Sequence, residues 1–212
     1  MKIATWNIER LKHKASLDLI TLACEQANAD ILVLTETDER VKPQYKYCLQ
    51  TPKLIGLEQT YYQPTENRVS IFTNYECVKR HPTYDEYTAL CIELKTERGN
   101  LLVYGTIIGI YGNRHRSFEE DLAKQLADIE RLSFGNQNLC VVGDFNCSFA
   151  DNYYYTKSGR TAMTAAFAKN QLALLTRNTS ECIDHIAISE KFLTGDTIQI
   201  ECSNFVQLLR TA

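Results

Sequence analysis

Residues 141–146 read Val-Val-Gly-Asp-Phe-Asn, and Leu139 and Cys140 precede them. This apolar run predicts a strand covered on both faces, and it ends at polar residues. Because side chains two apart on a strand face the same way, we expect Asp144 and Asn146 to point into one cavity. Gly143 would let the backbone turn closely there. A carboxylate beside a carboxamide suits activation of water, since one accepts a proton and the other positions the nucleophile or a phosphate.

Other predicted strands carry polar residues that differ from their apolar neighbours in the same way. A buried carboxylate is costly unless it is paired, hydrogen-bonded or bound to a metal. A single residue of this kind is more often a turn or cap residue. Five of them at strand ends predict an oxygen-rich cluster that suits Mg²⁺; these are Asn7, Glu36, Asp144, Asn146 and Asp184.

The remaining periodicity predicts many strands with a few helices between them. Strands are expected at 2–8, 31–36, 69–74, 88–94, 101–111, 139–144 and 182–189, and helices at 16–29, 117–132 and 161–170. Ser16 is the expected N-cap of the first helix, and Ser117 with Glu120 forms an expected capping box on the second. Strands that are apolar on both faces need cover on both sides. The pattern therefore predicts an α+β sandwich, a pair of sheets flanked by helices.

Length and composition limit the classes of protein that the chain can belong to. The 212 residues suit one domain, 1–212, and the formal net charge of −3 argues against a strongly basic nucleic-acid wrapper. The start lacks the apolar stretch of a signal peptide, and the longest apolar run, 101–111, is too short to span a bilayer. We therefore expect a cytoplasmic protein without a membrane span. Its oligomeric state stays open.

The eight cysteines contain no Cys-x-x-Cys pair, so the usual zinc-site and thioredoxin patterns are absent from the sequence. Cys91, Cys140 and Cys182 lie inside apolar runs and are interpreted as small buried hydrophobic residues.

Four motifs resemble, in order, those of the endonuclease/exonuclease/phosphatase superfamily, whose fold is that of deoxyribonuclease I-like enzymes. They are ATWNIE (4–9), ILVLTETDE (31–39), VVGDFN (141–146) and CIDHIAIS (182–189). The resemblance implies a four-layer sandwich in which helices flank two packed, mainly antiparallel β-sheets. It also implies hydrolysis of phosphodiesters or phosphomonoesters with Mg²⁺, for which Mn²⁺ is a substitute.

The resemblance also implies roles for individual residues. Glu36 would bind the metal with Asn7 beside it, and Asn7 is also a candidate phosphate ligand. Asp144 would activate the attacking water, Asn146 would orient water or phosphate, and Asp184 would orient a histidine that contacts the phosphate.

A further family motif is expected in GIYGNRHRS (109–117), where Tyr111 or Asn113 could fill its role. Their spacing differs by one residue from the family's Tyr-x-x-Asn. Arg114, followed by His115 and Arg116, could bind phosphate through charge-assisted hydrogen bonds. A solvated loop before a helix explains the same residues equally well, so both readings stay open.

The sequence departs from the family at its last motif, because it contains no Ser-Asp-His and ends in CSNFVQLLRTA (202–212). His185 directly follows Asp184 and would face the opposite side of its strand, so we interpret it as structural. The departure leaves open whether the family's terminal strand is present and whether activity is impaired.

The sequence thus favours a metal-dependent phosphoester hydrolase of phosphodiesterase or nuclease type, in which water attacks the phosphate in line. The alternative is a catalytically impaired relative that binds phosphate or nucleic acid. A nucleotide-binding doubly wound domain is disfavoured, since neither a Gly-x-Gly-x-x-Gly nor a Walker motif occurs. DNA, RNA, sugar phosphates and lipid phosphates all stay open as substrates.

Overall fold

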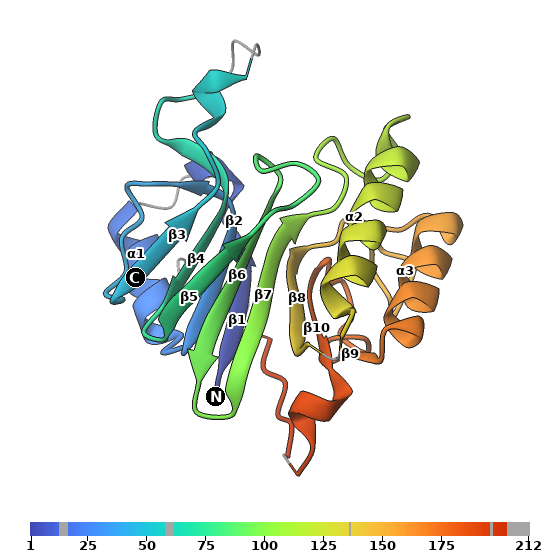
Figure 1. The fold of residues 1–212 in the computed structure, drawn as a ribbon. Helices are drawn as coiled ribbons and strands as arrows, with labels where there is room; N and C mark the ends of the chain where they lie inside the picture. Colours follow the sequence, from blue (N-terminus) through green and yellow to red (C-terminus); the bar gives the residue numbers. More distant parts are fainter. Residues whose placement is uncertain (13–16, 58–61, 136, 196, 203–212) are drawn as a thin grey trace.

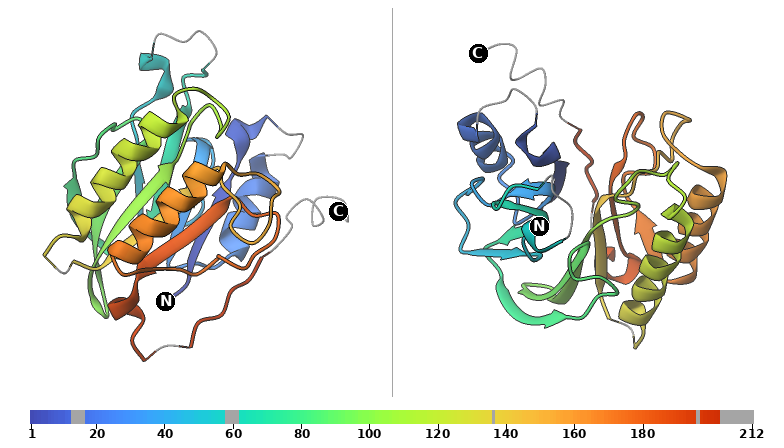
Figure 2. Two further views of the ribbon diagram at one scale, coloured as in Figure 1. Left: turned by 90° about the vertical axis from the view of Figure 1, so that its right-hand side faces the viewer. Right: turned by 90° about the horizontal axis from the view of Figure 1, so that it is seen from above.

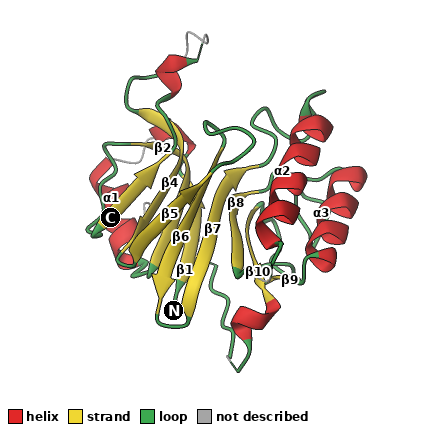
Figure 3. Cartoon of the chain, in the orientation of Figure 1, coloured by secondary structure: helices red, strands yellow, loops and turns green. Residues whose placement is uncertain are grey.

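The computed structural model describes residues 1–12, 17–57, 62–135, 137–195 and 197–202, and these residues form four layers. Seen from above in Figure 2, helix α1 (Leu17–Gln26) covers one sheet, while α2 (Phe118–Ser133) and α3 (Lys157–Lys169) cover the other. The two sheets pack against each other between these helices (Figures 1 and 3).

The first sheet has four strands in the order β1-β2-β4-β3. Only β1 and β2 run parallel, and the other neighbours are antiparallel. The strands are β1 (Ile3–Asn7), β2 (Ile31–Asp38), β3 (Tyr47–Gln50) and β4 (Glu66–Thr73).

The second sheet has six strands in the order β5-β6-β7-β8-β10-β9. Its single parallel pair is β7 with β8. The strands are β5 (Glu76–His81), β6 (Ala89–Thr96), β7 (Gly99–Ile107), β8 (Leu139–Asp144), β9 (Leu172–Leu174) and β10 (Asp184–Ser189). The 3-10 helices η1 (Glu9–Leu11), η2 (Leu54–Gly56) and η3 (Glu190–Leu193) complete the described elements.

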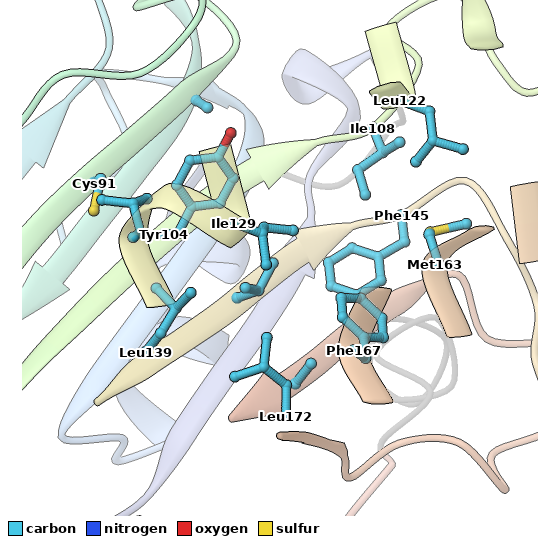
Figure 4. Close-up of a cluster of buried hydrophobic side chains, with 14 of the residues drawn as sticks. Cys91, Tyr104, Ile108, Leu122, Ile129, Leu139, Phe145, Met163, Phe167 and Leu172 are labelled. Carbon is cyan, nitrogen blue, oxygen red and sulfur yellow. The ribbon is translucent and has the colours of Figure 1, made fainter. Parts of the chain in front are cut away.

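The strands are apolar on both faces because each face meets a different layer. Val33 of β2 lies between the sheets, whereas its neighbours Leu32 and Leu34 pack with the α1 side. On β8, Val142 lies between the sheets and Val141 faces α2 and α3. Figure 4 shows the cluster between the six-stranded sheet and helices α2 and α3, where aromatic and aliphatic side chains from sheet and helices meet. This burial removes the apolar side chains from water on both faces of each sheet.

The predicted sandwich of mainly antiparallel sheets with flanking helices is confirmed, and every predicted strand and helix overlaps an observed one. The short strands β3, β5 and β9 were not predicted. Among the described residues β1 pairs with β2 alone. Lys2 Nζ lies 3.5 Å from Glu201 Oε2, so residue 201 lies beside the start of β1. No helix in the described ranges combines the length and apolar character needed to cross a bilayer.

Two local expectations are wrong. Ser117 does not cap α2, because its hydroxyl bonds to His115 Nδ1 at 2.7 Å, while Glu120 bonds to Lys124. Cys182 lies before β10 and is partly exposed, whereas Cys91 and Cys140 are buried as expected. Ser16, His13, Lys14 and residues 203–212 lie outside the described residues.

Close approach of the two sheets generates a stability prediction at Gly105 of β7. A Cβ there would lie 2.8 Å from Val69 Cγ1 and 3.2 Å from Val33 Cγ1. Gly105→Ala should lower the free energy of unfolding by about 1–3 kcal/mol through overpacking, measured by urea denaturation.

A double-mutant cycle tests this cause. In a Val69→Ala background the added cost of Gly105→Ala should shrink, because the contacting methyl is gone. An equal cost in both backgrounds would show that contact with Val69 is not the reason.

Candidate active site

Two carboxylates face each other where β8 ends and β10 begins. Asp144 and Asp184 are direct Cα partners in the antiparallel register of these strands. Residues directly opposite on neighbouring strands have their side chains on the same face of the sheet. The pairing therefore brings together two acidic groups that are 40 residues apart in the chain.

Asn7, at the end of β1, joins this pair from the other sheet. Its Nδ2 donates to Asp144 Oδ2 at 2.9 Å, and its Oδ1 accepts the Glu9 backbone N–H at 2.9 Å. The Asn7 backbone N–H also hydrogen-bonds to the Asp184 carboxylate. One residue of the four-stranded sheet thus contacts both carboxylates of the six-stranded sheet.

Asn146 reaches Asp144 through a turn and not through strand alternation. β8 ends at Asp144, and Asn146 adopts a left-handed φ of 47°. Its N–H donates to Asp144 Oδ1 at 2.8 Å, and its Nδ2 donates to Ile108 O at 3.0 Å. Gly143 makes the turn possible, since at its φ of 136° a Cβ would lie 2.1 Å from Thr106 O.

Only one candidate from the 109–117 loop lies against these residues. Asn113 is buried and donates from Nδ2 to Asn146 O at 2.8 Å, and its backbone N–H donates to the Tyr154 hydroxyl. Tyr111 is 50% exposed and packs on the His115 ring, and Arg114 is exposed as well. The loop therefore presents Asn113 to the site and turns Tyr111 and Arg114 to solvent.

Glu36 lies on β2 at a left-handed φ of 44° and is partly exposed. Its charge raises the pKa of both Asp144 and Asp184, so the three carboxylates share one neighbourhood. Its Oε2 lies 3.3 Å from Arg10 Nε, and Arg10 also pairs with buried Glu66 at 3.7 Å. Neither Arg10 nor Glu66 was predicted; a basic residue three positions after Asn7 is the signal that sequence reasoning passed over.

Burial is the main cause of the raised pKa values of Asp144 and Asp184. The charge of Asp184 raises the pKa of Asp144 further, and hydrogen bonds from Asn146 and Asn7 oppose this effect. Asp184 is partly exposed as a residue, yet its Oδ1 atom is buried and has no hydrogen-bond partner. Two like charges this close disfavour double ionisation, so the pair tends to retain a proton.

The histidines that the structure describes are engaged elsewhere. The buried His185 bonds through Nε2 to Cys147 O at 2.9 Å and through Nδ1 to the Thr176 hydroxyl, which agrees with a structural role. Burial lowers the pKa of His185 to about 4, so the ring is neutral at physiological pH. His81 bonds to Glu93, and His115 bonds to Ser117.

The donor set fits a hard divalent cation. Glu36, Asp144 and Asp184 offer carboxylate oxygens, and the Asp184 Oδ1 atom lacks any partner. Within the described ranges no group of three or more His, Cys, Asp or Glu could hold a metal by itself. Mg²⁺ commonly takes only one or two carboxylates and fills its shell with water and substrate phosphate.

The fold and the acidic cluster define a deoxyribonuclease I-like sandwich with its carboxylates where the two sheets meet. A family model described as the Endonuclease/Exonuclease/phosphatase family matches residues 4–204. The chain belongs to this family. A comparison with curated proteins found no match.

Solved structures share this fold at low sequence identity. An endonuclease/exonuclease/phosphatase from Beutenbergia cavernae superposes with a TM-score of 0.66 at 15% identity, over 90% of this chain and 64% of that one. A 3'-5' exonuclease from Neisseria meningitidis gives 0.61 at 18% identity, over 90% and 88%. A Neisseria 3' phosphatase bound to a product DNA hairpin gives 0.62 at 16%, over 90% and 87%. The chain thus spans under two thirds of the first of these proteins.

The raised pKa of Asp184 predicts how stability depends on pH. The folded-state pKa of about 6 lies above the unfolded value of about 3.9, so ionisation of Asp184 destabilises the fold as the pH rises between them. Asp184→Asn removes this cost. The free energy of unfolding of the variant minus that of the unsubstituted protein should therefore increase by about 1 kcal/mol from pH 5 to pH 8. Urea denaturation of both proteins at each pH measures this difference.

Asp151→Asn is the control. The pKa of Asp151 is lowered by hydrogen bonds from the backbone N–H groups of Glu181 and Tyr153, so this variant should show no such rise. A stability difference for Asp184→Asn that does not change with pH would contradict the proposed cause.

Proposed function

We propose that the protein is a divalent-metal-dependent phosphoester hydrolase. In the proposed reaction, water attacks the phosphate in line. The observation that carries this proposal is the environment of the Asp144 carboxylate. Asn7 Nδ2 and the Asn146 N–H donate to it and orient it, and burial and the charge of Asp184 raise its pKa. A raised pKa makes the carboxylate a stronger base toward water. Membership of the family supports the reaction class.

The residues of the cluster have different roles in the reaction. Asp144 accepts the proton of the attacking water. The Nδ2 group of Asn146 is held by Ile108 O and Gly109 O, so its carboxamide oxygen is left to orient that water. Asn113 fixes the Asn146 backbone from the neighbouring loop. The charge of Asp184 raises the pKa of Asp144, and its carboxylate accepts the Asn7 backbone N–H.

Glu36 and Asp184, with Asn7 beside them, are the residues that would hold Mg²⁺ or Mn²⁺. The bound cation would offset the charge of the phosphate and acidify water. The unpartnered Asp184 Oδ1 atom supports this assignment, because a buried carboxylate oxygen without a partner is costly.

Nucleic acid is the first substrate class to test. The Neisseria relatives are a 3'-5' exonuclease and a 3' phosphatase bound to a DNA hairpin, which makes terminal phosphates and phosphodiesters natural candidates. The net charge of −3 favours a short contact with few phosphates over a long one.

A second candidate is a phosphate-binding protein with weak turnover. The engagement of His81, His115 and His185 away from Asp184 favours it, since Asp184 then has no described histidine to orient. Losing one donor to the phosphate can cost about 10²–10³ in rate. Mg²⁺-dependent phosphate binding without turnover on any phosphoester would support this candidate.

Asp144→Asn tests the hydrolase directly. Removing the proposed base while keeping its shape should lower Mg²⁺-dependent hydrolysis by about 10²–10⁴-fold. Hydrolysis of bis-p-nitrophenyl phosphate and of 3'-phosphorylated DNA would be followed with and without Mg²⁺. The exposed Asp18→Asn on α1 provides the same charge change outside the site and should leave the rate unchanged. Full turnover by Asp144→Asn would exclude Asp144 as the base.

A further inference from the structure

Arg10 is the arginine that the structure places directly on a predicted metal-binding carboxylate. Its Nε lies 3.3 Å from Glu36 Oε2 and its Nη1 3.7 Å from Glu66 Oε2. Its guanidinium also lies 5.2 Å from the centre of the Tyr62 ring. The side chain is only 18% exposed, so these contacts hold it within the site and away from bulk water.

The backbone that carries Arg10 is strained. Glu9, Arg10 and Leu11 have φ values of 49°, 54° and 57°, three consecutive left-handed residues without a glycine. Each such residue costs about 1–2 kcal/mol. The turn is held by Leu11 N–H on Ile8 O at 3.0 Å and by Glu9 N–H on Asn7 Oδ1. Strain of this kind gathers at functional sites, and here it directs the guanidinium to Glu36.

The site is acidic, so a negatively charged phosphate needs a positive group beside it in order to bind. Asp144, Asp184, Glu36 and Glu9 lie close enough that the charges of the two glutamates raise the pKa of Asp184. A phosphate group approaching this cluster meets repulsion unless positive charge stands beside it. A guanidinium binds carboxylate and phosphate with the same planar fork, so it can exchange one for the other.

We propose that Arg10 is a phosphate-binding residue, and that it gives up Glu36 to a divalent cation as it takes the substrate's phosphate. The inference rests on the proposed phosphoester hydrolase function. It assigns to Arg10, within the carboxylate cluster, the role that the sequence suggested for the exposed Arg114. Glu66, buried beside the guanidinium, keeps Arg10 at the site during the exchange.

The test compares Arg10→Gln with Arg40→Gln in the full chain. Arg40 is the matched control because it pairs with Asp38 at 2.9 Å and lies within electrostatic reach of Glu66. Mn²⁺ binding would be measured by calorimetry without phosphate, and inorganic phosphate binding would be measured at saturating Mg²⁺. Arg10→Lys serves as a second variant that keeps the charge without the fork.

The expected signature is a pair of opposite changes. Arg10→Gln should bind Mn²⁺ about three- to tenfold more tightly, because a competitor for Glu36 is gone, and phosphate at least about tenfold more weakly. Arg40→Gln should change both constants by less than about twofold. Arg10→Lys should restore part of the phosphate affinity.

Other results would overturn the proposal. Arg10 does not exchange partners if Arg10→Gln weakens the binding of both Mn²⁺ and phosphate, or if it leaves both affinities unchanged. The same conclusion follows if Arg40→Gln produces the same changes in affinity. If Arg10→Gln fails to fold, Arg10→Lys decides, and unchanged phosphate affinity in that variant rejects the fork. If the unsubstituted protein binds neither ion and hydrolyses no phosphoester, the hydrolase proposal itself fails. If the unsubstituted protein hydrolyses a phosphoester but the variants bind Mn²⁺ and phosphate as it does, the role of Arg10 is rejected and the hydrolase proposal stands.

Discussion

The hydrogen bond from Asn7 Nδ2 to Asp144 Oδ2 joins the two sheets at the point where their polar strand ends meet. Asn7 belongs to the four-stranded sheet and Asp144 to the six-stranded one. The apolar interior between the sheets fixes their separation, and Gly105 allows their close approach. The site is therefore a consequence of sandwich packing, because Asn7 of one sheet meets Asp144 of the other only when the two sheets pack together.

The same packing creates an electrostatic cost. Burial raises the pKa values of Asp144 and Asp184, the charge of Asp184 raises the pKa of Asp144 further, and the charge of Glu36 raises both. A cluster of like charges destabilises a fold unless cations or protons offset it. Arg10 supplies one positive charge on the Glu36 side, where a strained turn holds it. A bound divalent cation would supply the rest, which connects the stability of this region with its proposed chemistry.

The sequence contained the sandwich and the identity of the clustered residues, since Val33 and Val142 lie in runs that need cover on both faces. The ordered motifs predicted strand ends for Asn7, Glu36, Asp144, Asn146 and Asp184, whereas in the structure β2 runs past Glu36 to Asp38 and Asn146 follows β8 in a turn. Other features depend on contacts distant in sequence. The strand β5 is mostly exposed at an edge and has no apolar pattern to reveal it. Asn146 reaches its neighbours through a positive φ that depends on Gly143 and on the path of β7.

The positions of the 109–117 loop residues and of Arg10 also depend on contacts that the sequence pattern does not reveal. Tyr111 and Arg114 point outward because Asn113, held by Tyr154 and Asn146, sets the conformation of the loop. Arg10 meets Glu36 and Glu66 only through a left-handed turn, a conformation that no residue type in 9–11 favours. The metal, the catalytic roles and the substrate class stay predictions.

The most direct test of the coupled carboxylate cluster is a ¹³C carboxyl NMR titration of Asp144 and Asp184, with and without Mg²⁺. The expected result is two coupled titrations with pKa values above the usual aspartate value of about 3.9, both of which shift to lower pH when Mg²⁺ is added. Ordinary, independent pKa values that do not respond to Mg²⁺ would contradict it.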